Sequence, residues 1–442
     1  MNIQLSDHFT YKKLLRFTLP SIAMMIFTSI YGVVDGFFVS NYVGKTPFAA
    51  VNFIMPFLMI LGTFGFMFGT GGSALVSKTM GEGDMEKANR LFSMLTYVSI
   101  GVGVVVATLG IIFIRPIASF LGAEGVLLDD CVLYGRIVLA ALPFFMLQME
   151  FQTFFVTAEK PQLGLLATLA AGIANMILDG LFIAVFRLGL AGAAIATALS
   201  QFVGGLFPLC YFFSPNSSLL RLTRAPFDGR ALIKTVTNGS SELMSNISMS
   251  LVGMLYNVQL MKYAGEDGVA AYGVLMYINM IFIGAFIGYS IGTAPLIGYH
   301  YGAGNHNELR NILQKSLFVI GLFSVCMLVL GEVFARPLSL IFVAYDPELL
   351  HLTLSGFRIF SFSFLFAGLA IFGSGFFTAL NNGLVSALIS FLRTLVFQVA
   401  AILWLPTLWG VNGIWISVVV AELMAAAVTG SFLVWLRNTY YY

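Results

Sequence analysis

Few ionisable side chains interrupt the long apolar stretches of this sequence, and two of them could bind a proton or a small cation. Asp35 and Asp179 lie in different apolar stretches, each a few turns from one end. If both stretches are helical, the two carboxyl groups lie roughly 10–12 Å below the same surface. An acid at membrane depth is costly and by default marks a functional site. We expect no base at that depth unless Arg136 or Arg187 reaches inward.

Two further oxygen-bearing side chains arrive at a similar depth. Asn175 precedes Asp179 by one helical turn and therefore shares its face. Thr197 lies roughly 12 Å deep on the next predicted helix. Carboxylate, amide and hydroxyl oxygens are the ligands of small hard cations such as Na⁺. Asn175 or Thr197 alone would more often make a structural hydrogen bond, but with the two acids they predict a cation pocket.

Two more acids, Glu150 and Glu242, lie within apolar stretches. We expect both to border a substrate cavity, where they would balance a positive charge. Pro20 interrupts the hydrogen-bond ladder of the first predicted helix. The resulting kink is either a hinge or a plain bend.

Arg393 and Glu422 are both expected near mid-membrane, on the last two predicted helices. Because an isolated charge is costly there, we expect a buried ion pair with a structural role.

The composition predicts an integral membrane protein. Hydrophobic residues make up 59% of the chain and charged residues 10%, against about 25% charged in soluble domains. The apolar stretches are long enough to cross a bilayer. We expect twelve transmembrane helices, at residues 9–41, 46–77, 85–114, 127–156, 161–186, 189–213, 229–262, 267–299, 307–335, 346–378, 381–405 and 409–437.

The sequence repeats with an offset of 221 residues. Gly71 falls on Gly292 and Gly189 on Gly410, and the pairs Arg115-Pro116 and Thr157-Ala158 fall on Arg336-Pro337 and Thr378-Ala379. Such a repeat predicts two six-helix lobes related by a pseudo-twofold axis along the membrane normal. The predicted units are 1–213 (first lobe, helices 1–6), 214–230 (cytoplasmic linker) and 231–442 (second lobe, helices 7–12).

The repeat is not symmetric in its chemistry. The equivalents of Asp35 and Asp179 are Tyr256 and Ala400. We therefore expect the cation pocket in the first lobe alone.

The distribution of Lys and Arg orients the chain. With the N-terminus in the cytoplasm, fourteen basic residues lie at inner helix ends and seven at outer ends. We therefore expect both termini in the cytoplasm of a multi-pass plasma-membrane protein. The inner set is Lys12, Lys13, Arg16, Lys78, Lys87, Arg90, Lys160, Arg221, Arg224, Arg230, Lys234, Arg310, Lys315 and Arg437.

Several functions lack the residues that they need. The three cysteines and four histidines show no ligand spacing, so no resident metal and no cofactor are expected. The string Gly81-Glu82-Gly83-Asp84 matches the GxGD signature of intramembrane aspartyl proteases. Its repeat copy carries Asn305 in place of Asp84, which argues against an enzyme. No nucleotide-binding P-loop is present, so an ion gradient would supply the energy. Nucleic acid is not an expected partner, and a monomer is expected.

Taken together, these landmarks resemble the multidrug and toxic compound extrusion (MATE) family. The resemblance rests on Pro20 and the Val-Asp-Gly-Phe-Phe-Val-Ser run around Asp35, on 175–179 and 192–197, and on Glu242. It implies a V-shaped, all-helical fold and antiport of organic cations against H⁺ or Na⁺. It also implies a coupling site at Asp35, Asn175, Asp179 and Thr197, with Pro20 as a hinge and Tyr134 near that cavity.

One departure bears on the coupling ion. Members with an acid that matches Glu242 also carry an aspartate on the tenth helix. This chain has only Ser361, Ser363 and Ser374 there. A sodium site built on two carboxylates in the second lobe is therefore not expected, which favours H⁺ over Na⁺.

The predicted function is a secondary antiporter for multidrug efflux, of the kind that confers antibiotic resistance. It would export amphiphilic or cationic compounds, with a cavity between the lobes, lined by aromatic residues and Met, to hold their apolar bodies. The alternative is a flippase for a lipid-linked saccharide or cell-wall precursor. That substrate is anionic and would require a basic cavity, and Arg393 is the one base expected at mid-membrane.

Overall fold

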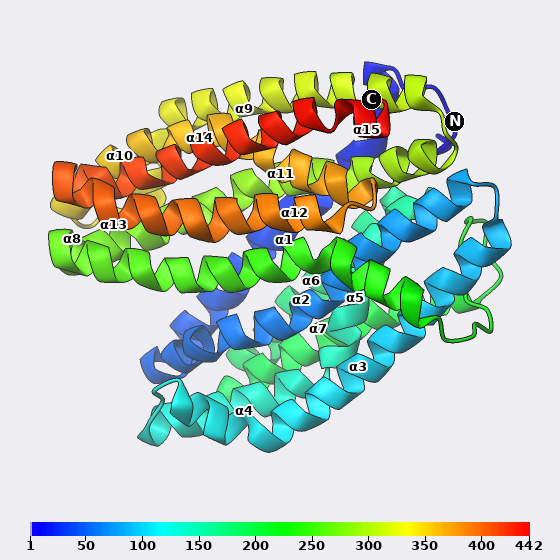
Figure 1. The fold of residues 1–442 in the computed structure, drawn as a ribbon. Helices are drawn as coiled ribbons and strands as arrows, with labels where there is room; N and C mark the ends of the chain where they lie inside the picture. Colours follow the sequence, from blue (N-terminus) through cyan, green and yellow to red (C-terminus); the bar gives the residue numbers. More distant parts are fainter. Residues whose placement is uncertain (1) are drawn as a thin grey trace.

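The computed structural model describes residues 2–442, and all regular secondary structure in that range is helical (Figure 1). The first lobe runs up to Phe213. Its elements are α1 (Tyr11–Tyr42), α2 (Lys45–Gly81), α3 (Met85–Phe120), α4 (Gly125–Ala140), α5 (Leu142–Thr157), α6 (Pro161–Asp179), the π-helix η1 (Gly180–Val185) and α7 (Gly189–Phe213).

The second lobe follows a non-helical connection that ends at Asp228, two residues before the predicted end of the linker. Its elements are α8 (Gly229–Gly302), α9 (His306–Val343), α10 (Pro347–Phe360), the short 3₁₀ helix η2 (Ser361–Ser363), α11 (Phe364–Ala379), α12 (Gly383–Phe391), the π-helix η3 (Leu392–Val396), α13 (Phe397–Trp409), α14 (Val411–Trp435) and α15 (Arg437–Tyr440).

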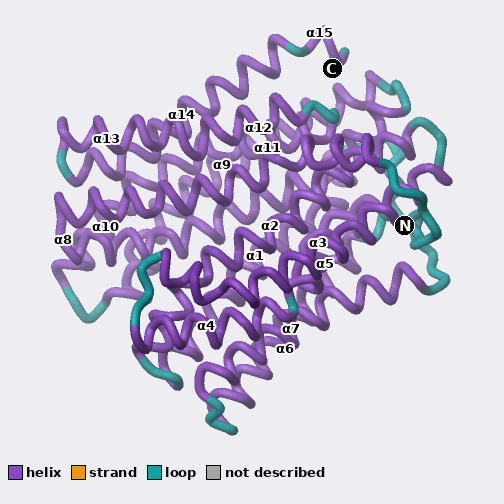
Figure 2. Tube along the Cα trace, turned by 60° about the horizontal axis from the view of Figure 1, so that its bottom comes forward, coloured by secondary structure: helices purple, strands orange, loops and turns teal. Residues whose placement is uncertain are grey.

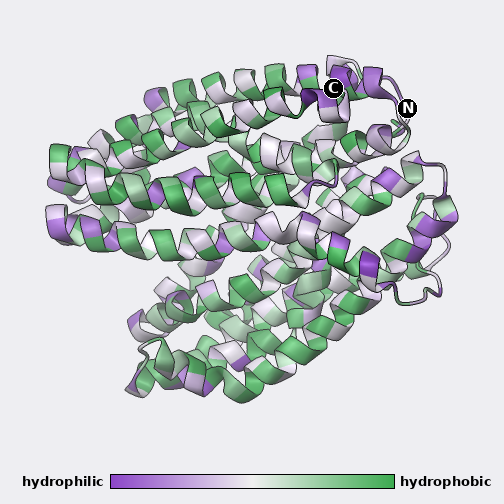
Figure 3. Ribbon diagram, viewed as in Figure 1, coloured by the Kyte–Doolittle hydropathy of each residue, from purple (hydrophilic) through white to green (hydrophobic). Residues whose placement is uncertain are grey.

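These helices make the twelve predicted membrane crossings. In the described range ten helices are long and apolar enough to span a bilayer, and α4 with α5, bent by 58° at their junction, forms a further span. The 74-residue α8 provides two crossings because Gly265 interrupts it, with φ 67° and ψ −155°. Glycine adopts positive φ without steric cost. Apolar residues cover the middle of the helices and hydrophilic ones gather toward their ends (Figure 3).

Both termini lie at the same end of the bundle, which we call the terminal side (Figure 1). The two lobes are separate helix groups in both views (Figures 1 and 2). Their close contacts identify where the lobes meet.

A stripe of glycines on α8 packs against the terminal half of α1. A Cβ atom at Gly292 would lie 3.0 Å from Thr18 Cβ, and one at Gly288 would lie 2.5 Å from Ile22 Cα. These helices touch because glycine lacks a side chain, as in other close membrane helix pairs. The last polar contact along the stripe is Ser29 Oγ donating to the Met280 carbonyl at 3.2 Å.

The contact ends beyond that point. Gly273, on the same face of α8, has no atom within 4 Å of a built Cβ, and Gly36 on α1 meets only Phe48 of its own lobe. The two helices are therefore in contact on the terminal side and apart on the opposite side.

Contacts between α2 and α8 follow the same rule. Gly71 abuts the Thr235 carbonyl, Gly81 the Tyr299 carbonyl, and Gly302 the Lys78 carbonyl. All of these residues belong to the terminal halves of their helices. The lobes consequently form a V that is closed on the terminal side and open on the other.

The segment before α1 crosses between the lobes on the terminal side. The Leu5 amide donates to Glu159 Oε1 of the first lobe at 2.6 Å. The Phe9 amide donates to Glu308 Oε1 of the second lobe at 2.8 Å, and His8 Nδ1 lies 2.7 Å from Glu308 Oε2. Leu5 and Phe9 are fully buried. Residues 5–9 therefore tie both lobes together, and we call them the strap.

Glu159 lies in the connection between α5 and α6, with φ 62°. Burial raises the pKa of its carboxyl group, and the hydrogen bond from the Leu5 amide opposes that shift. Glu159, which binds the first-lobe end of the strap, therefore loses its proton at a pH above the usual range of a glutamate.

Candidate functional site

Four helices of the first lobe bring the predicted pocket residues together. Asp35 comes from the part of α1 away from the terminal side, Asn175 and Asp179 from the last turns of α6, and Thr197 from α7. Tyr134 of α4 joins them. Gly172 allows α1 to approach α6, because a Cβ there would clash with the rings of Phe27 and Tyr31.

The side chains of this group, which we call the acid cluster, are near neighbours. The Asp35 and Asp179 carboxyl groups are close enough to influence each other, and Asn175 lies close to Asp35. Tyr134 faces Thr197 and is close to both acids. Asp179 is fully buried, Asn175 and Tyr134 nearly so, while Asp35 and Thr197 are half-buried.

The oxygens of the acid cluster approach one another without forming well-aligned hydrogen bonds. Both Asp179 oxygens and Asp35 Oδ1 lack a partner of ordinary geometry within residues 2–442, as do the Asn175, Thr197 and Tyr134 side-chain oxygens. Buried oxygens in native proteins are normally satisfied. A convergent set of unpartnered carboxyl, amide and hydroxyl oxygens fits a small hard cation or a proton.

The backbone changes its helical geometry next to Asp179. The helix changes from α to π geometry immediately after Asp179, over Gly180–Val185. The second π-helix, η3, contains Arg393 and belongs to the equivalent span of the second lobe. Short π segments inside α-helices often occur at functional sites. Periodicity in the sequence does not distinguish these turns from α-helix.

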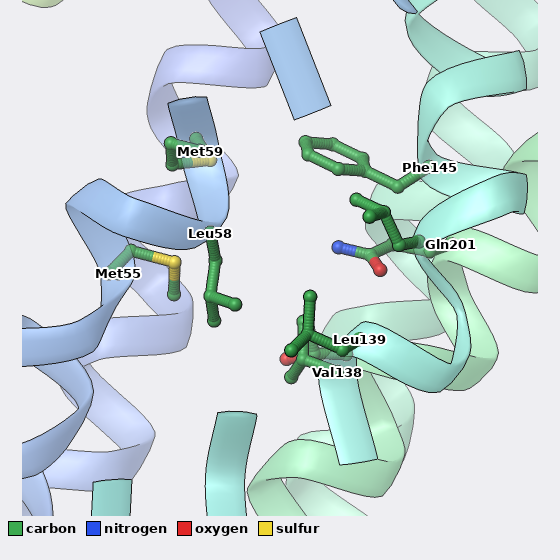
Figure 4. A pocket seen from close by; sticks show the side chains of 9 residues that line it. Met55, Leu58, Met59, Val138, Leu139, Phe145 and Gln201 are labelled. Atoms are coloured by element: carbon green, nitrogen blue, oxygen red, sulfur yellow. The ribbon is translucent and has the colours of Figure 1, made fainter. Parts of the chain in front are cut away.

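A small cavity of about 20 Å³ lies inside the first lobe, next to the acid cluster (Figure 4). Met55, Leu58 and Met59 of α2 line one side, and Phe145 and Gln201 the other. Thr197 belongs both to its wall and to the acid cluster. The expected substrate cavity between the lobes stays a prediction, and this smaller space within the first lobe is lined by two Met and one aromatic residue.

Glu150 does not border that cavity. Its side chain is fully buried in the interior of the first lobe, where α5 packs on Gly69 of α2 and faces Ser99 of α3. Glu150 is fully buried in this conformation, and its place in a substrate cavity stays a prediction.

Pro20 lies within α1, which continues as one helix from Tyr11 to Tyr42. Its neighbours Thr18 and Ile22 both contact the glycine stripe of α8. The proline therefore sits in the part of α1 that is held against the second lobe.

The second lobe carries a different set of charges. Arg393 and Glu422 form an ion pair with a Nε–Oε2 distance of 2.9 Å. Glu242 of α8 is half-buried and close enough to Arg393 to feel its charge. Arg393 thus pairs with Glu422 and lies near a second acid, Glu242.

The repeat equivalents of the acid cluster are neutral. Tyr256, at the position equivalent to Asp35, donates to Gln398 Oε1 at 2.7 Å and stacks on Tyr272. The Tyr256 hydroxyl group therefore has a hydrogen-bond partner within the second lobe. The acid cluster is therefore confined to the first lobe.

Two residues near the acid cluster escaped the sequence argument. Tyr31 precedes Asp35 by one turn and is close enough to sense its charge. Gln201 follows Thr197 by one turn, with a buried, unpartnered Oε1. The i,i+4 spacing from Asp35 and Thr197 would have identified both.

A twelve-span bundle of two related lobes, with an unneutralised pair of acids in one of them, defines a polytopic membrane transporter. The sequence pattern of the MatE family matches residues 20–181 and 243–403, once in each half. The chain therefore belongs to the multidrug and toxic compound extrusion (MATE) family, whose members are transporters and not enzymes.

Known proteins resemble the chain over nearly its whole length. The multidrug export protein MepA of Staphylococcus haemolyticus (strain JCSC1435) is 26% identical over 433 residues, covering 97% of this chain and 94% of that protein. The outward-facing conformation of a multidrug resistance MATE family transporter of the MOP superfamily has a TM-score of 0.92 at 24% identity, covering 99% and 98%. A MATE crystal structure in the straight conformation has a TM-score of 0.91, also at 24% identity, covering 98% and 97%.

Proposed function

We propose that this transporter is a secondary antiporter that exports amphiphilic or cationic drugs and toxic compounds in exchange for H⁺ or Na⁺. The acid cluster carries the proposal: it gathers two carboxyl groups and three further side-chain oxygens, many without hydrogen-bond partners, and in residues 2–442 no base forms an ion pair with its acids. The naming of similar proteins as multidrug export proteins supports the substrate class.

Coupling follows from the charge of the acid cluster. Two carboxylates in a site with little water repel each other, so a shared proton or a bound Na⁺ relieves that repulsion. Loss of the charge would let α1 rearrange around Pro20 and close the first-lobe cavity, expelling the substrate. H⁺ is the preferred coupling ion, since the tenth predicted helix offers Ser361, Ser363 and Ser374 but no acid that could complete a two-carboxylate sodium site with Glu242.

The first-lobe cavity supports a permissive site for apolar groups. Met55, Met59 and Phe145 line it, and Met side chains adapt to many shapes. In this conformation its volume of about 20 Å³ holds about one water molecule, so a substrate would enter only when the cavity widens. Asp35 and Asp179 would balance a positive charge from one side, and Glu242 from the other lobe.

We assign the terminal side to the cytoplasm of the plasma membrane on the Lys and Arg distribution. The V then opens outward in this conformation. The chain acts as a monomer in the lipid bilayer, because each lobe completes its own bundle.

The flippase alternative has no comparable support. An anionic headgroup would need a free base at membrane depth, and Arg393 is already held by Glu422. Drug export is therefore the function that the site chemistry favours.

Purified protein in proteoliposomes tests the proposal. Vesicles are loaded with ethidium, and its movement is followed under an imposed pH gradient or an imposed Na⁺ gradient. We expect transport to follow the pH gradient at constant Na⁺. Transport that ignores both gradients would refute antiport, and transport that follows only Na⁺ would replace the proton as the coupling ion.

A further inference from the structure

The fully buried carboxyl group of Glu150 has no role in the acid cluster. Both of its oxygens lack a hydrogen-bond partner within the described chain, and so does the facing Ser99 hydroxyl. The two side chains are near neighbours. The Thr153 hydroxyl bonds to the Glu150 main-chain carbonyl and not to its carboxyl group.

No charged group compensates Glu150. The helices packed on α5 are α2, α3, α4, α6, α7 and α8. Their ionisable side chains form no ion pair with Glu150 in residues 2–442, and Ser99 is the only side chain found acting on it. That set comprises Lys45, Lys78, Glu86, Lys87, Arg90, Tyr97, Arg115, Asp129, Asp130, Cys131, Tyr134, Arg136, Asp179, Cys210, Tyr211, Arg230, Lys234, Glu242, Tyr256, Lys262, Tyr263, Glu266, Asp267, Tyr272, Tyr277, Tyr289, Tyr299, His300 and Tyr301.

An unpaired carboxylate ion buried away from water would cost far more than a neutral carboxylic acid. Glu150 is therefore protonated in this conformation, in which its side chain is fully buried. Ionisation would require water or a partner to reach the carboxyl group.

The internal repeat provides an independent observation. With the offset of 221 residues, Glu150 and Ser99 fall on Ile371 and Ile320 of the equivalent helices α11 and α9. Ile320 is buried and Ile371 packs against the same apolar core. The duplicated fold thus packs this position with two apolar side chains, so packing does not explain an acid and a hydroxyl in the first lobe.

We propose that Glu150 and Ser99 form a second proton-binding site of the transporter, separate from the acid cluster. A proton from water adds to one carboxylate oxygen of Glu150 and returns to water when the first lobe opens, and the Ser99 hydroxyl hydrogen-bonds the carboxyl group. This assignment rests on the proposed proton coupling for its place in transport, but proton binding by Glu150 does not depend on it.

The depth of the site gives it a distinct task. Glu150 lies ten residues from Lys160 at the terminal end, roughly 15 Å along the helix. Asp179 lies eighteen residues from Pro161, roughly 27 Å from the same end. Glu150 is therefore nearer the terminal side, where coupled protons would be released.

Infrared spectroscopy of the protein in lipid nanodiscs tests proton binding directly. The wild type should show a carbonyl stretch of a protonated carboxyl group that E150Q lacks and D35N retains. S99A should shift that band. If the wild-type and E150Q spectra are identical from mildly acidic to alkaline pH, Glu150 carries no proton and the proposal fails.

Ethidium transport driven by a pH gradient tests the role in the cycle. E150Q should fold, since it is isosteric, and lose most of the gradient-driven transport, while E150D, which keeps a carboxyl group, should recover part of it. The double variant S99I/E150I reproduces the second-lobe pair, so it should fold but fail to couple. Wild-type transport by E150Q, or equal loss in E150D, would overturn the role.

These outcomes separate the two proposals. A wild type that moves no ethidium, but whose infrared band disappears in E150Q, contradicts the proposed export and leaves the proton site standing. A wild type that exports normally, with transport and spectrum unchanged in E150Q, contradicts the second site and leaves the proposed function intact.

Discussion

Arg393 of the π-helix η3 and Glu422 of α14 form an ion pair that contains two hydrogen bonds. Arg393 Nε donates to Glu422 Oε2 at 2.9 Å, and Nη2 donates to Oε1 at 3.1 Å. Parallel hydrogen bonds of this kind are the strongest form of an Arg–carboxylate contact. With side-chain exposures of 16% and 7%, neither partner is well hydrated. The ion pair therefore neutralises the charges of Arg393 and Glu422. The acid cluster of the first lobe contrasts with it, because there two acids face each other.

We expect Arg393→Met to destabilise the protein more than removal of both charges does. Losing one partner leaves Glu422 buried and uncompensated, at a cost of roughly 3–5 kcal/mol. The double variant Arg393→Met/Glu422→Gln should recover part of the loss. Melting of the detergent-solubilised protein, followed by fluorescence size-exclusion chromatography, measures this. A double variant no more stable than Arg393→Met would show that the pair does not carry the effect.

Asp35→Asn should abolish drug export without unfolding the protein. The substitution keeps the shape of the side chain but removes the titratable group that faces Asp179. Resistance to ethidium in a pump-deficient host, at matched expression, is the measurement. Asp129→Asn is the matched control because Asp129 is an exposed acid that pairs with Arg115 at 2.9 Å. It should leave resistance intact, and wild-type resistance in Asp35→Asn would contradict a coupling role.

Much of the fold could be predicted because the bilayer imposes simple constraints. Apolar length counts the helices, and the offset of 221 residues divides them into two groups. The depth arithmetic placed Asp35, Asn175, Asp179 and Thr197 at one level, since rise per residue is fixed in a helix. The structure brings these side chains together.

Lateral position could not be predicted in the same way. Depth places Glu150 in the membrane but does not tell which neighbour its face meets, so its burial against Ser99 was missed. The strap was missed because its residues bind partners remote in sequence: Glu159 lies 154 residues from Leu5, and Glu308 lies 299 residues from Phe9. No periodicity records such contacts.

Glu159→Gln should change how stability depends on pH. Burial raises the pKa of Glu159 in the folded protein, so the folded state binds its proton more tightly than the unfolded state does. That contribution is fully present below the usual glutamate value of about 4.3 and is lost as pH rises through the folded value. The melting temperature of the wild type, relative to Glu159→Gln, should therefore fall with rising pH. A difference in melting temperature between the wild type and Glu159→Gln that stays constant or grows in favour of the wild type as pH rises would contradict this.

Cysteines placed across the glycine stripe should lock the lobes on the terminal side. A Cβ at Gly292 lies 3.0 Å from Thr18 Cβ, slightly closer than the roughly 3.5–4.5 Å of a disulfide. A small displacement would permit the bond. In a background lacking Cys131, Cys210 and Cys326, we expect Thr18→Cys/Gly292→Cys to crosslink on oxidation. Ethidium transport should then stop, because opening the terminal side requires these helices to separate, and a reductant should restore it.

The same two helices offer a control pair further along the stripe. Gly36 and Gly273 lie beyond the Ser29–Met280 contact, where a Cβ on Gly273 meets no atom within 4 Å. Gly36→Cys/Gly273→Cys should therefore stay uncrosslinked in the conformation with the V open and become crosslinked only when that side closes. A substrate or pH change that closes the V should raise its crosslinking while lowering that of Thr18→Cys/Gly292→Cys. If both pairs crosslink together under every condition, then α1 and α8 do not exchange contacts during transport, and alternating closure of the two sides is excluded.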